Sequence, residues 1–416
     1  MSLDATQNRV RLVVGGQEYG GWKSVKIEAG IERQARSFTL EVTDRWPGQI
    51  AAIRRVQPFD ACQVFIGEDL VLTGYVDATP IQYDGKRISV AVKGRSKTAD
   101  LVDCSPPDSA AGSRSKSASV NLWANASANQ AGAVVKPAAA GVNVWRNARL
   151  ETIAAALAAP YGVRVRSEVD TGAPIAEHHV QIGETVFESI DRMMRLRHVL
   201  STDNAQGDLV FIDVGSAGHA STALEVGKNI REGSCELDFK DVFSKYVVKG
   251  QRAGNDADFG ENANEAEGDD GSEADVEGSA GTPALASLAD ARAKRFRVKV
   301  FKQAGHADDG TCQDRALYER AHRAAKALET TYTLAGWRQA DARLWVPNLL
   351  VRVRDPLIGF DNVMVIAEVH YELDANGLRT RLRVGPPDGY RSKAAKVSKN
   401  RRKTTHGGAD LWSAVP

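Results

Sequence analysis

Apolar and polar residues alternate through most of the first hundred positions, and this pattern constrains the fold more than any other feature of the sequence. Residues 10–14 and 38–42 each carry an apolar side chain at alternate positions. A period of two places these side chains on one face of a β-strand. Turn-forming residues separate the runs, at Gly15-Gly16, Trp46-Pro47-Gly48, Gly67-Glu68-Asp69 and Asp84-Gly85. We expect about six short strands, which favours a small β-barrel or sandwich over residues 1–105.

The length and charge of the chain limit its class. Its 416 residues exceed one ordinary core, because a domain generally holds roughly 100 to 200 residues. Lys and Arg total 54 and Asp and Glu total 53, a net charge of +1, which argues against wrapping nucleic acid or coating an anionic membrane. No apolar stretch approaches the roughly 20 residues that cross a bilayer. Residues 1–14 lack the pattern of a secretory leader, so we expect no transmembrane segment and folding in the cytoplasm.

The periodicity changes in the middle of the chain. After a Ser/Ala-rich excursion at residues 109–140, apolar residues recur at three- and four-residue spacing, which predicts helices. Residues 149–159 form the first, which Pro160 and Gly162 would stop. Gly183-Glu184-Thr185 opens the second, and strands are expected at residues 163–165 and 209–212. Residues 106–220 are therefore predicted to form an α+β middle domain.

Strand patterns return in residues 221–388, where we predict a second β-module. Strands are expected at residues 246–248 and 331–384, and a helix at residues 314–330, with Ala316, Ala324 and Leu328 on its packed side.

An acidic segment interrupts this second module. Residues 254–282 hold ten acidic residues and no basic one. Such a composition repels itself and buries little apolar surface, so we expect an exposed loop.

Two hairpins far apart in the chain have similar sequences. Leu70-Val71-Leu72, Val76, Asp84-Gly85, Ile88, Val90, Val92 and Gly94 are echoed by Val363-Met364-Val365, Val369, Asn376-Gly377, Thr380, Leu382, Val384 and Gly385. Because only one hairpin matches in each part of the chain, coincidence is the alternative explanation. It predicts an α+β, mainly β fold, in which two similar small β-barrel-like modules flank the middle domain.

The sequence contains no recognisable catalytic or metal-binding motif. Phosphate-binding glycine loops are absent, and residues 215–218 lack the spacing of a nucleophile elbow. Residues 203–208 are rich in oxygen ligands but lack the full calcium-loop spacing, so a helix-to-strand turn is favoured. His178 and His179 are adjacent, which points their rings to opposite faces of an extended segment. We therefore predict no catalytic residue, no metal and no cofactor.

The cysteines suggest neither zinc nor disulfides. Cys62, Cys104, Cys235 and Cys312 lie far apart, without a C-x-x-C pair or a close histidine. In a reducing compartment they are expected to pack as small apolar residues.

Residues 389–416 form a basic tail with the candidate docking residues. Seven Lys or Arg occur between Arg391 and Lys403 with no acid among them. Solubilisation and protein docking both suit such a tail, and docking is our hypothesis. The candidate docking residues are Arg391, Lys393, Lys396, Lys399, Arg401, Arg402, Lys403 and, as an apolar anchor, Trp412.

Five strings in order give the chain a family resemblance. They are GRSKTADLVDC at 94–104, YGV at 161–163, GETVFE at 183–188, YVVKG at 246–250 and LWVPN at 344–348. Together they resemble the baseplate hub protein of Mu-like contractile-tailed phages, and the resemblance covers most of residues 5–388. The acidic loop, the Ser/Ala-rich excursion and the tail do not map onto the family pattern.

The resemblance implies a structural role. In this family three copies form a ring between the tail tube and the central membrane-piercing spike, so the implied partners are two further copies, the spike, the tube and other baseplate proteins. Two similar modules per chain would give a trimer six near-equivalent surfaces for a six-fold tube. The implied location is the virion tail baseplate, after synthesis and assembly in the host cytoplasm, without nucleic acid recognition.

Two other functions compete with the hub. A tail-associated cell-wall hydrolase needs only two carboxylates that face one cleft. With 53 acidic residues in the chain, the sequence does not exclude such a pair. A carbohydrate- or surface-binding module would need an exposed aromatic platform, which the seven scattered tryptophans do not suggest.

Overall fold

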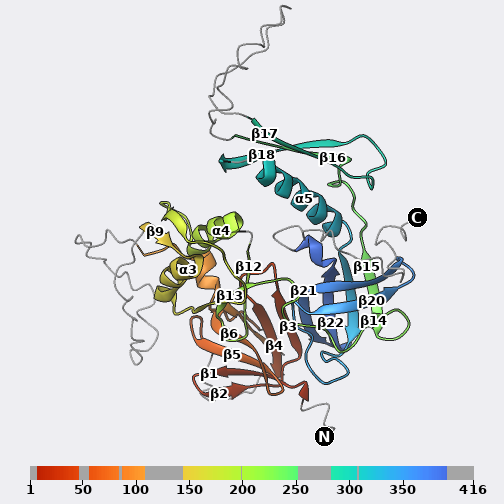
Figure 1. The fold of residues 1–416 in the computed structure, drawn as a ribbon. Helices are drawn as coiled ribbons and strands as arrows, with labels where there is room; N and C mark the ends of the chain where they lie inside the picture. The colour runs from red at the N-terminus through yellow and green to blue at the C-terminus, as the bar shows by residue number, and fades with distance from the viewer. Residues whose placement is uncertain are drawn as a thin grey trace, which may run out of the picture.

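Strands dominate the computed structural model of the chain (Figure 1). The structure describes residues 7–45, 56–83, 87–107, 144–197, 199–251, 283–306 and 309–390. The Ser/Ala-rich excursion, the acidic segment and the tail residues 391–416 lie outside these ranges. Among the described helices, none has the length and apolar character needed to cross a membrane.

The N-terminal alternation forms strands, as predicted. They are β1 (Val10–Val14), β2 (Gln17–Tyr19), β3 (Ser24–Gly30), β4 (Ser37–Arg45), β5 (Ala61–Ile66), β6 (Asp69–Ala78), β7 (Ile81–Tyr83) and β8 (Arg87–Ser96). Leu12, Val64 and Leu72 come from three of these strands and are fully buried in one core. Burial of alternate side chains is the main stabilising contribution to these strands.

The middle of the chain is a small α+β body. Its elements are α2 (Ala99–Asp103), β9 (Val144–Ala148), α3 (Leu150–Ala158), η1 (Ala159–Tyr161), β10 (Val165–Ser167), β11 (Ile175–His179), α4 (Val186–Arg197), β12 (Leu200–Asp203) and β13 (Leu209–Ile212). Helix α4 begins with a reciprocal cap, because Glu188 N donates to Thr185 Oγ1 at 3.1 Å and Thr185 N donates to Glu188 Oε2 at 2.8 Å. Ile153, Ile190 and Phe211 are fully buried where α3 and α4 cover the strands.

The rest of the chain returns to strands. They are β14 (Leu224–Glu225), β15 (Ile230–Cys235), β16 (Lys245–Gln251), β17 (Pro283–Ala289), β18 (Val298–His306), β19 (Thr330–Ala335), β20 (Leu350–Asp355), β21 (Phe360–Asp374) and β22 (Gly377–Gly385), with α5 (Asp309–Lys326) and η3 (Pro387–Gly389). Helix α5 ends earlier than predicted, because Thr330 already pairs with Val384 in β19. Ala316, Ala324 and Leu328 are buried, as expected.

The N-terminal strands β1–β8 and the later strands β14, β15 and β19–β22 belong to one sheet, and we call these two sets the β-halves. The described strands close no barrel. The sheet has fourteen described strands: eleven follow the order β15-β19-β22-β21-β3-β4-β8-β6-β5-β1-β2, and β7, β14 and β20 pair off this path. The expectation of two separate barrel-like modules is therefore corrected: the strands of both halves belong to one open sheet. The cause is the 15-residue strand β21, which pairs along one edge first with β20 and then, from Glu368 to Leu373, with β3.

The two echoed segments both form antiparallel strand pairs, but in different registers. Gly94 of β8 lies opposite Val76. Gly385 of β22 lies opposite Val365, whereas the sequence echo would place it opposite Val369. Each pair contains a register shift, so the segments are similar without being equivalent residue by residue.

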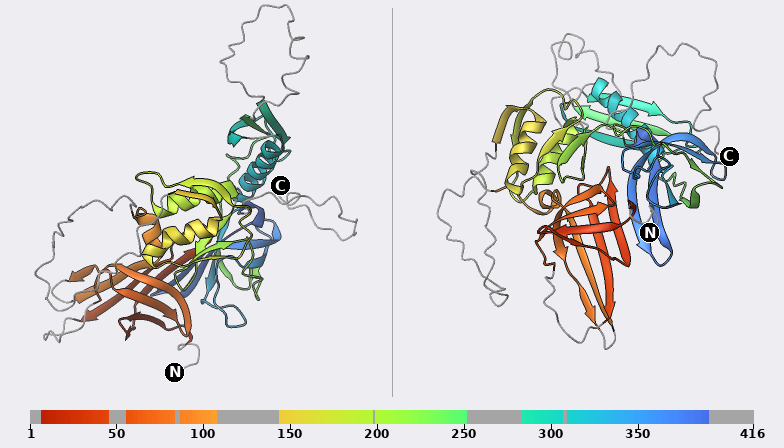
Figure 2. Two further views of the ribbon diagram at one scale, coloured as in Figure 1. Left: turned by 60° about the vertical axis from the view of Figure 1, so that its left-hand side comes forward. Right: turned by 90° about the horizontal axis from the view of Figure 1, so that it is seen from below.

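A third body projects from the large sheet as an arm (Figures 1 and 2). We define the arm as the three-stranded sheet β17-β16-β18 and the helix α5 that covers one face of it. Val248, Ala286, Cys312 and Ala316 form the small core between them.

Candidate functional site

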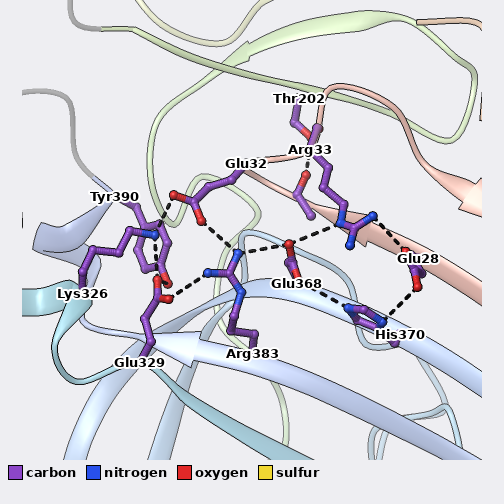
Figure 3. Close-up of polar contacts among 11 residues, drawn as sticks. Glu28, Glu32, Arg33, Thr202, Lys326, Glu329, Glu368, His370, Arg383 and Tyr390 are labelled. Carbon is purple, nitrogen blue, oxygen red and sulfur yellow. Dashed lines mark hydrogen bonds and ion pairs between the residues drawn. The ribbon is translucent and has the colours of Figure 1, made fainter. Parts of the chain in front are cut away.

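Charged side chains gather where the two β-halves join (Figure 3). We call the contact between β3 and β21 the seam. Because β21 also pairs with β22, charges of opposite sign face each other across three strands. The rows are Gly30, Glu368 and Arg383, then Glu28, His370 and Arg381, then Lys26, Glu372 and Arg379. Cross-strand pairs of opposite charge favour this register over its neighbours.

Arg383 holds the centre of the seam. Its Nη2 lies 2.9 Å from Glu32 Oε2 and 3.0 Å from Glu368 Oε1, and its Nη1 lies 2.9 Å from Glu329 Oε2. These carboxylates come from three separate segments: the connection after β3, strand β21 and the connection after α5. One guanidinium thus ties together parts of the chain that no local structure would join.

A second group of ion pairs extends the seam along β3. Arg33 Nη1 lies 2.8 Å from Glu28 Oε2, and its Nε lies 3.2 Å from Glu368 Oε1. The His370 ring lies between the same two carboxylates, with Nδ1 3.5 Å from Glu28 Oε1 and Nε2 3.3 Å from Glu368 Oε2.

The last residues of α5 connect the arm to the seam. Lys326 Nζ lies 2.6 Å from both Glu32 Oε1 and Glu329 Oε1, and 4.2 Å from the centre of the Tyr390 ring. The buried hydroxyl of Tyr390 donates a hydrogen bond to Glu329. The orientation of the arm therefore depends on the same ions that join the two β-halves.

The surroundings of Glu368 and Glu329 lower the pKa of each carboxyl group, which favours the charged form at neutral pH. The hydrogen bond from His370, with the charges of Arg383 and Arg33, outweighs burial and lowers the pKa of Glu368 to about 2. Burial alone would raise the pKa of Glu329, but hydrogen bonds from Lys326 and Tyr390 lower it overall. Carboxylates of lowered pKa are poor proton donors, so the seam is suited to joining surfaces rather than to acid catalysis.

The seam is expected to weaken in acid. The pKa of Glu368 is about 2, below the ordinary 4.5, so its ionisation stabilises the fold above pH 4.5 and this contribution is lost as the pH falls towards 2. We expect Glu368→Gln to lower the free energy of unfolding by roughly 2 kcal/mol at pH 7 and by clearly less at pH 3. Urea unfolding at both pH values measures this. The exposed Glu18→Gln is the control, and an effect of Glu368→Gln that is equal at both pH values would contradict the prediction.

The middle body is fastened to the N-terminal half by a buried carboxylate. Arg36 N donates to Asp203 Oδ2 at 2.9 Å, and Arg36 Nε donates to Asp203 Oδ1 at 3.3 Å. Burial raises the pKa of Asp203 even though Arg36 opposes the shift. At 2% exposure, Asp203 is closed to a substrate and serves as an anchor.

Residues 204–208 form a turn, as predicted, but the turn joins strand β12 to strand β13 and not a helix to a strand. Asn204 Oδ1 accepts hydrogen bonds from the backbone N–H groups of Gln206 and Asp208, at 3.0 and 2.9 Å, and Asp208 pairs with Arg166 at 2.8 Å. Across the described ranges, no three His, Cys, Asp or Glu side chains gather in a group that could hold a metal ion.

The two adjacent histidines occupy opposite faces of β11, as predicted. His178 is buried, with its Nε2 2.8 Å from Ser189 Oγ, while the exposed His179 lies 3.1 Å from Glu177.

Ser216 and the cysteines occupy structural positions. Ser216 Oγ donates to Glu168 at 2.9 Å and accepts from Asn348 Nδ2 at 2.9 Å. None of the four cysteines, all within the described ranges, forms a disulfide.

Sequence reasoning found candidate docking residues that the structure does not describe and missed the seam that it does. Arg391, Lys393, Lys396, Lys399, Arg401, Arg402, Lys403 and Trp412 all lie beyond residue 390, outside the described residues. The seam had a signal of its own, because residues 368–372 and 379–383 both carry charge at alternate positions.

Three family models match the chain in order. They describe the N-terminal domain of a GpP-like Mu phage baseplate assembly protein at 9–96, the second domain of a gp44-like baseplate hub protein at 131–213, and the fourth domain of the Mu phage baseplate assembly protein GpP at 309–393. The baseplate hub protein gp44 of Escherichia phage Mu is 32% identical over 409 residues, covering 97% of this chain and 94% of gp44.

Two solved structures are similar along most of their length. The 43 kDa tail protein of prophage MuSo2 from Shewanella oneidensis has a TM-score of 0.72 and 26% identity, covering 92% of this chain and 99% of that protein. A tail protein from Neisseria meningitidis has a TM-score of 0.68 and 18% identity, covering 92% and 98%. The second likeness concerns the fold alone.

Proposed function

This chain belongs to the family of Mu-like phage baseplate hub proteins, and from that premise we propose that three copies form a ring joining the tail tube of a contractile tail to the central spike. The similarity to gp44 along nearly the whole chain carries this proposal. We propose accordingly that the protein is part of the virion tail baseplate and that it is synthesised and assembled in the host cytoplasm.

The shared sheet supports a role in adapting symmetry. Each chain offers two β-halves fused through β3 and β21, so three chains would offer six halves to a six-fold tube while remaining three-fold for the spike. The echoed strand pairs differ in register, which makes the six surfaces near-equivalent rather than identical. A rigid seam would hold the two halves of each chain at a fixed angle.

We also propose that residues 1–105, 106–220, 221–388 and 389–416 are the units of the chain. The core of the middle body supports the boundary near residue 220, because its buried members end at Phe211, but it also includes Leu101 of α2, which argues for a first boundary a few residues before 105. The shared sheet makes the first and third units partners rather than independent modules.

We propose that the protein is not an enzyme and binds no cofactor. The relatives reported above are named as baseplate and tail proteins. The alternative, a tail-associated cell-wall hydrolase, requires a carboxyl group of raised pKa that reaches its substrate. The carboxylates of the seam have cationic partners and Asp203 is buried. Burial also raises the pKa of the half-buried Asp100, so Asp100 is the carboxyl group that the following assay tests. A muralytic zymogram is expected to stay uncleared, and a cleared band would favour the hydrolase.

The homotrimer is tested by its mass in solution. Light scattering or analytical ultracentrifugation should give three times the 44.8 kDa of one chain. A monomer at every concentration would refute the ring, although the family assignment would stand.

The basic tail is proposed to guide docking to the spike or to a neighbouring baseplate protein. Its seven like charges would triple in a trimer, and each exposed contact contributes at most about 1 kcal/mol. Truncation after Tyr390 should therefore leave the fold and the trimer intact but slow association with the spike protein, most strongly at low salt. Trp412→Ala in the full chain separates the apolar anchor from the charges. Equal association rates of truncated and full chains at low ionic strength would show that the tail is only solvated.

A further inference from the structure

The described residues leave one face of the arm sheet uncovered. Helix α5 packs against the face that carries Val248 and Ala286, and Figure 1 shows no helix or strand over the opposite face. Three rows of cross-strand neighbours make up this open face. The rows are Leu285, Lys249 and Lys302, then Ser287, Val247 and Val300, then Ala289, Lys245 and Val298. We call these nine residues the lysine face.

The lysine face combines apolar and basic side chains without an acid. Leu285 and Val300 are each 54% exposed and Val298 is 39% exposed, although aliphatic residues in a stable sheet are normally covered. Lys249 and Lys302 lie directly opposite each other, and both are exposed. Like charges at this spacing repel, so an acidic partner would relieve the repulsion and an apolar one would cover the valines.

A second lysine face is an unsuitable partner. Two copies packed face to face would bring Lys245, Lys249 and Lys302 of one chain against the same lysines of the other. Juxtaposed like charges oppose such an interface. The occupant must therefore carry carboxylates, and its surface must differ from the lysine face.

The chain itself contains an acidic segment of this kind. Residues 254–282, with ten acids and no base, make up most of the connection from the last residue of β16 to the first of β17, which are paired as Gln251 and Pro283. Half of that connection, extended at about 3.3 Å per residue, reaches about 50 Å. The lysine face is only about 10 Å across its three strands.

The acidic segment is longer and carries more charge than the lysine face of its own chain can use. Three lysines can pair with only three of the ten carboxylates. The lysine face also lies close to the strand ends from which the segment leaves, so most of the segment extends beyond it. We propose that the lysine face receives the acidic segment 254–282 of a neighbouring copy. The contact joins two different surfaces, so it can be repeated around a ring. It rests on the proposed homotrimer and adds to it a named interface.

Two complementary variants test this contact. The face variant carries Lys249→Glu and Lys302→Glu and keeps the acidic segment. The loop variant keeps the lysine face and has residues 254–282 replaced by Gly-Ser-Gly. Each alone should associate about 10- to 100-fold more weakly than the wild type. Their mixture should form a 1:1 complex by light scattering, because one supplies the segment and the other the face. Added salt should weaken that complex.

Controls separate this proposal from the trimer itself. Lys23→Glu with Lys93→Glu makes the same charge change on exposed residues of the N-terminal half and should leave association unchanged. Circular dichroism checks that every variant is folded. Failure of the mixture to form a complex, or self-association of both variants at wild-type strength, would overturn the contact. A wild-type monomer would refute the ring, while the mixture would still decide whether face and segment bind.

Discussion

Replacing Arg383 by Met is expected to lower the free energy of unfolding by about 3 to 5 kcal/mol, the cost of leaving partly buried carboxylates without their cation. Arg383 reaches Glu32, Glu329 and Glu368 at once, and its own side chain is only 24% exposed. Methionine retains much of the apolar stem but removes the charge. The remaining carboxylates would repel one another across the seam. Urea denaturation at pH 7 measures the loss.

Arg354→Met is the matched control for this change. Arg354 also lies on a strand and pairs with Glu225 at 2.7 Å, but its side chain is 53% exposed. Exposed ion pairs contribute little, so we expect a loss within about 1 kcal/mol. Similar losses in the two variants would mean that water screens the seam as fully as it screens the surface.

Gly74→Ala is expected to be at least as damaging, for a steric reason. Gly74 lies on β6 between Cys62 of β5 and Ser96 of β8. A Cβ at this position would lie 1.9 Å from the carbonyl oxygen of Arg95 and 2.6 Å from the Cα of Ser96. Both atoms belong to the backbone of β8, so no side-chain rotation relieves the overlap. We expect a loss of about 3 kcal/mol or more, or no cooperative unfolding transition.

Gly20→Ala provides the comparison in the same half of the chain. Its Cβ would lie 3.4 Å from Arg9 Nη2, at the end of a flexible side chain. We expect a change within about 0.5 kcal/mol. Thermal or urea unfolding of both variants distinguishes the two positions, and a loss below about 1 kcal/mol for Gly74→Ala would contradict a close approach of β6 and β8.

Local patterns in the sequence predicted the elements well, because each depends on neighbouring residues. The spacing of Thr185 and Glu188 indicates the start of α4 through a cap that closes over three positions. Alternation likewise predicts β1, where Val10, Leu12 and Val14 are buried.

Pairing between distant strands could not be predicted in the same way. Arg33 and Glu368 are 335 residues apart, and nothing near either residue specifies the other. Two half-buried strands with charges at alternate positions can pair in many combinations. Strand β21 is long enough to pair with both β20 and β3 along one edge. This double pairing joins the two halves into a shared sheet instead of separate barrels.

The pairing of β3 with β21 also determines when the protein can finish folding. At roughly 5 to 20 residues per second, a ribosome needs roughly 20 to 70 s to pass from β3 to β21. During that time β3 has β4 on one side and an open edge on the other, where it is exposed to strands of other nascent chains. Lys26 and Glu28 lie on this strand, and charged residues on an edge discourage such pairing. The residues that later form the seam therefore also protect the unfinished chain from aggregation during its synthesis.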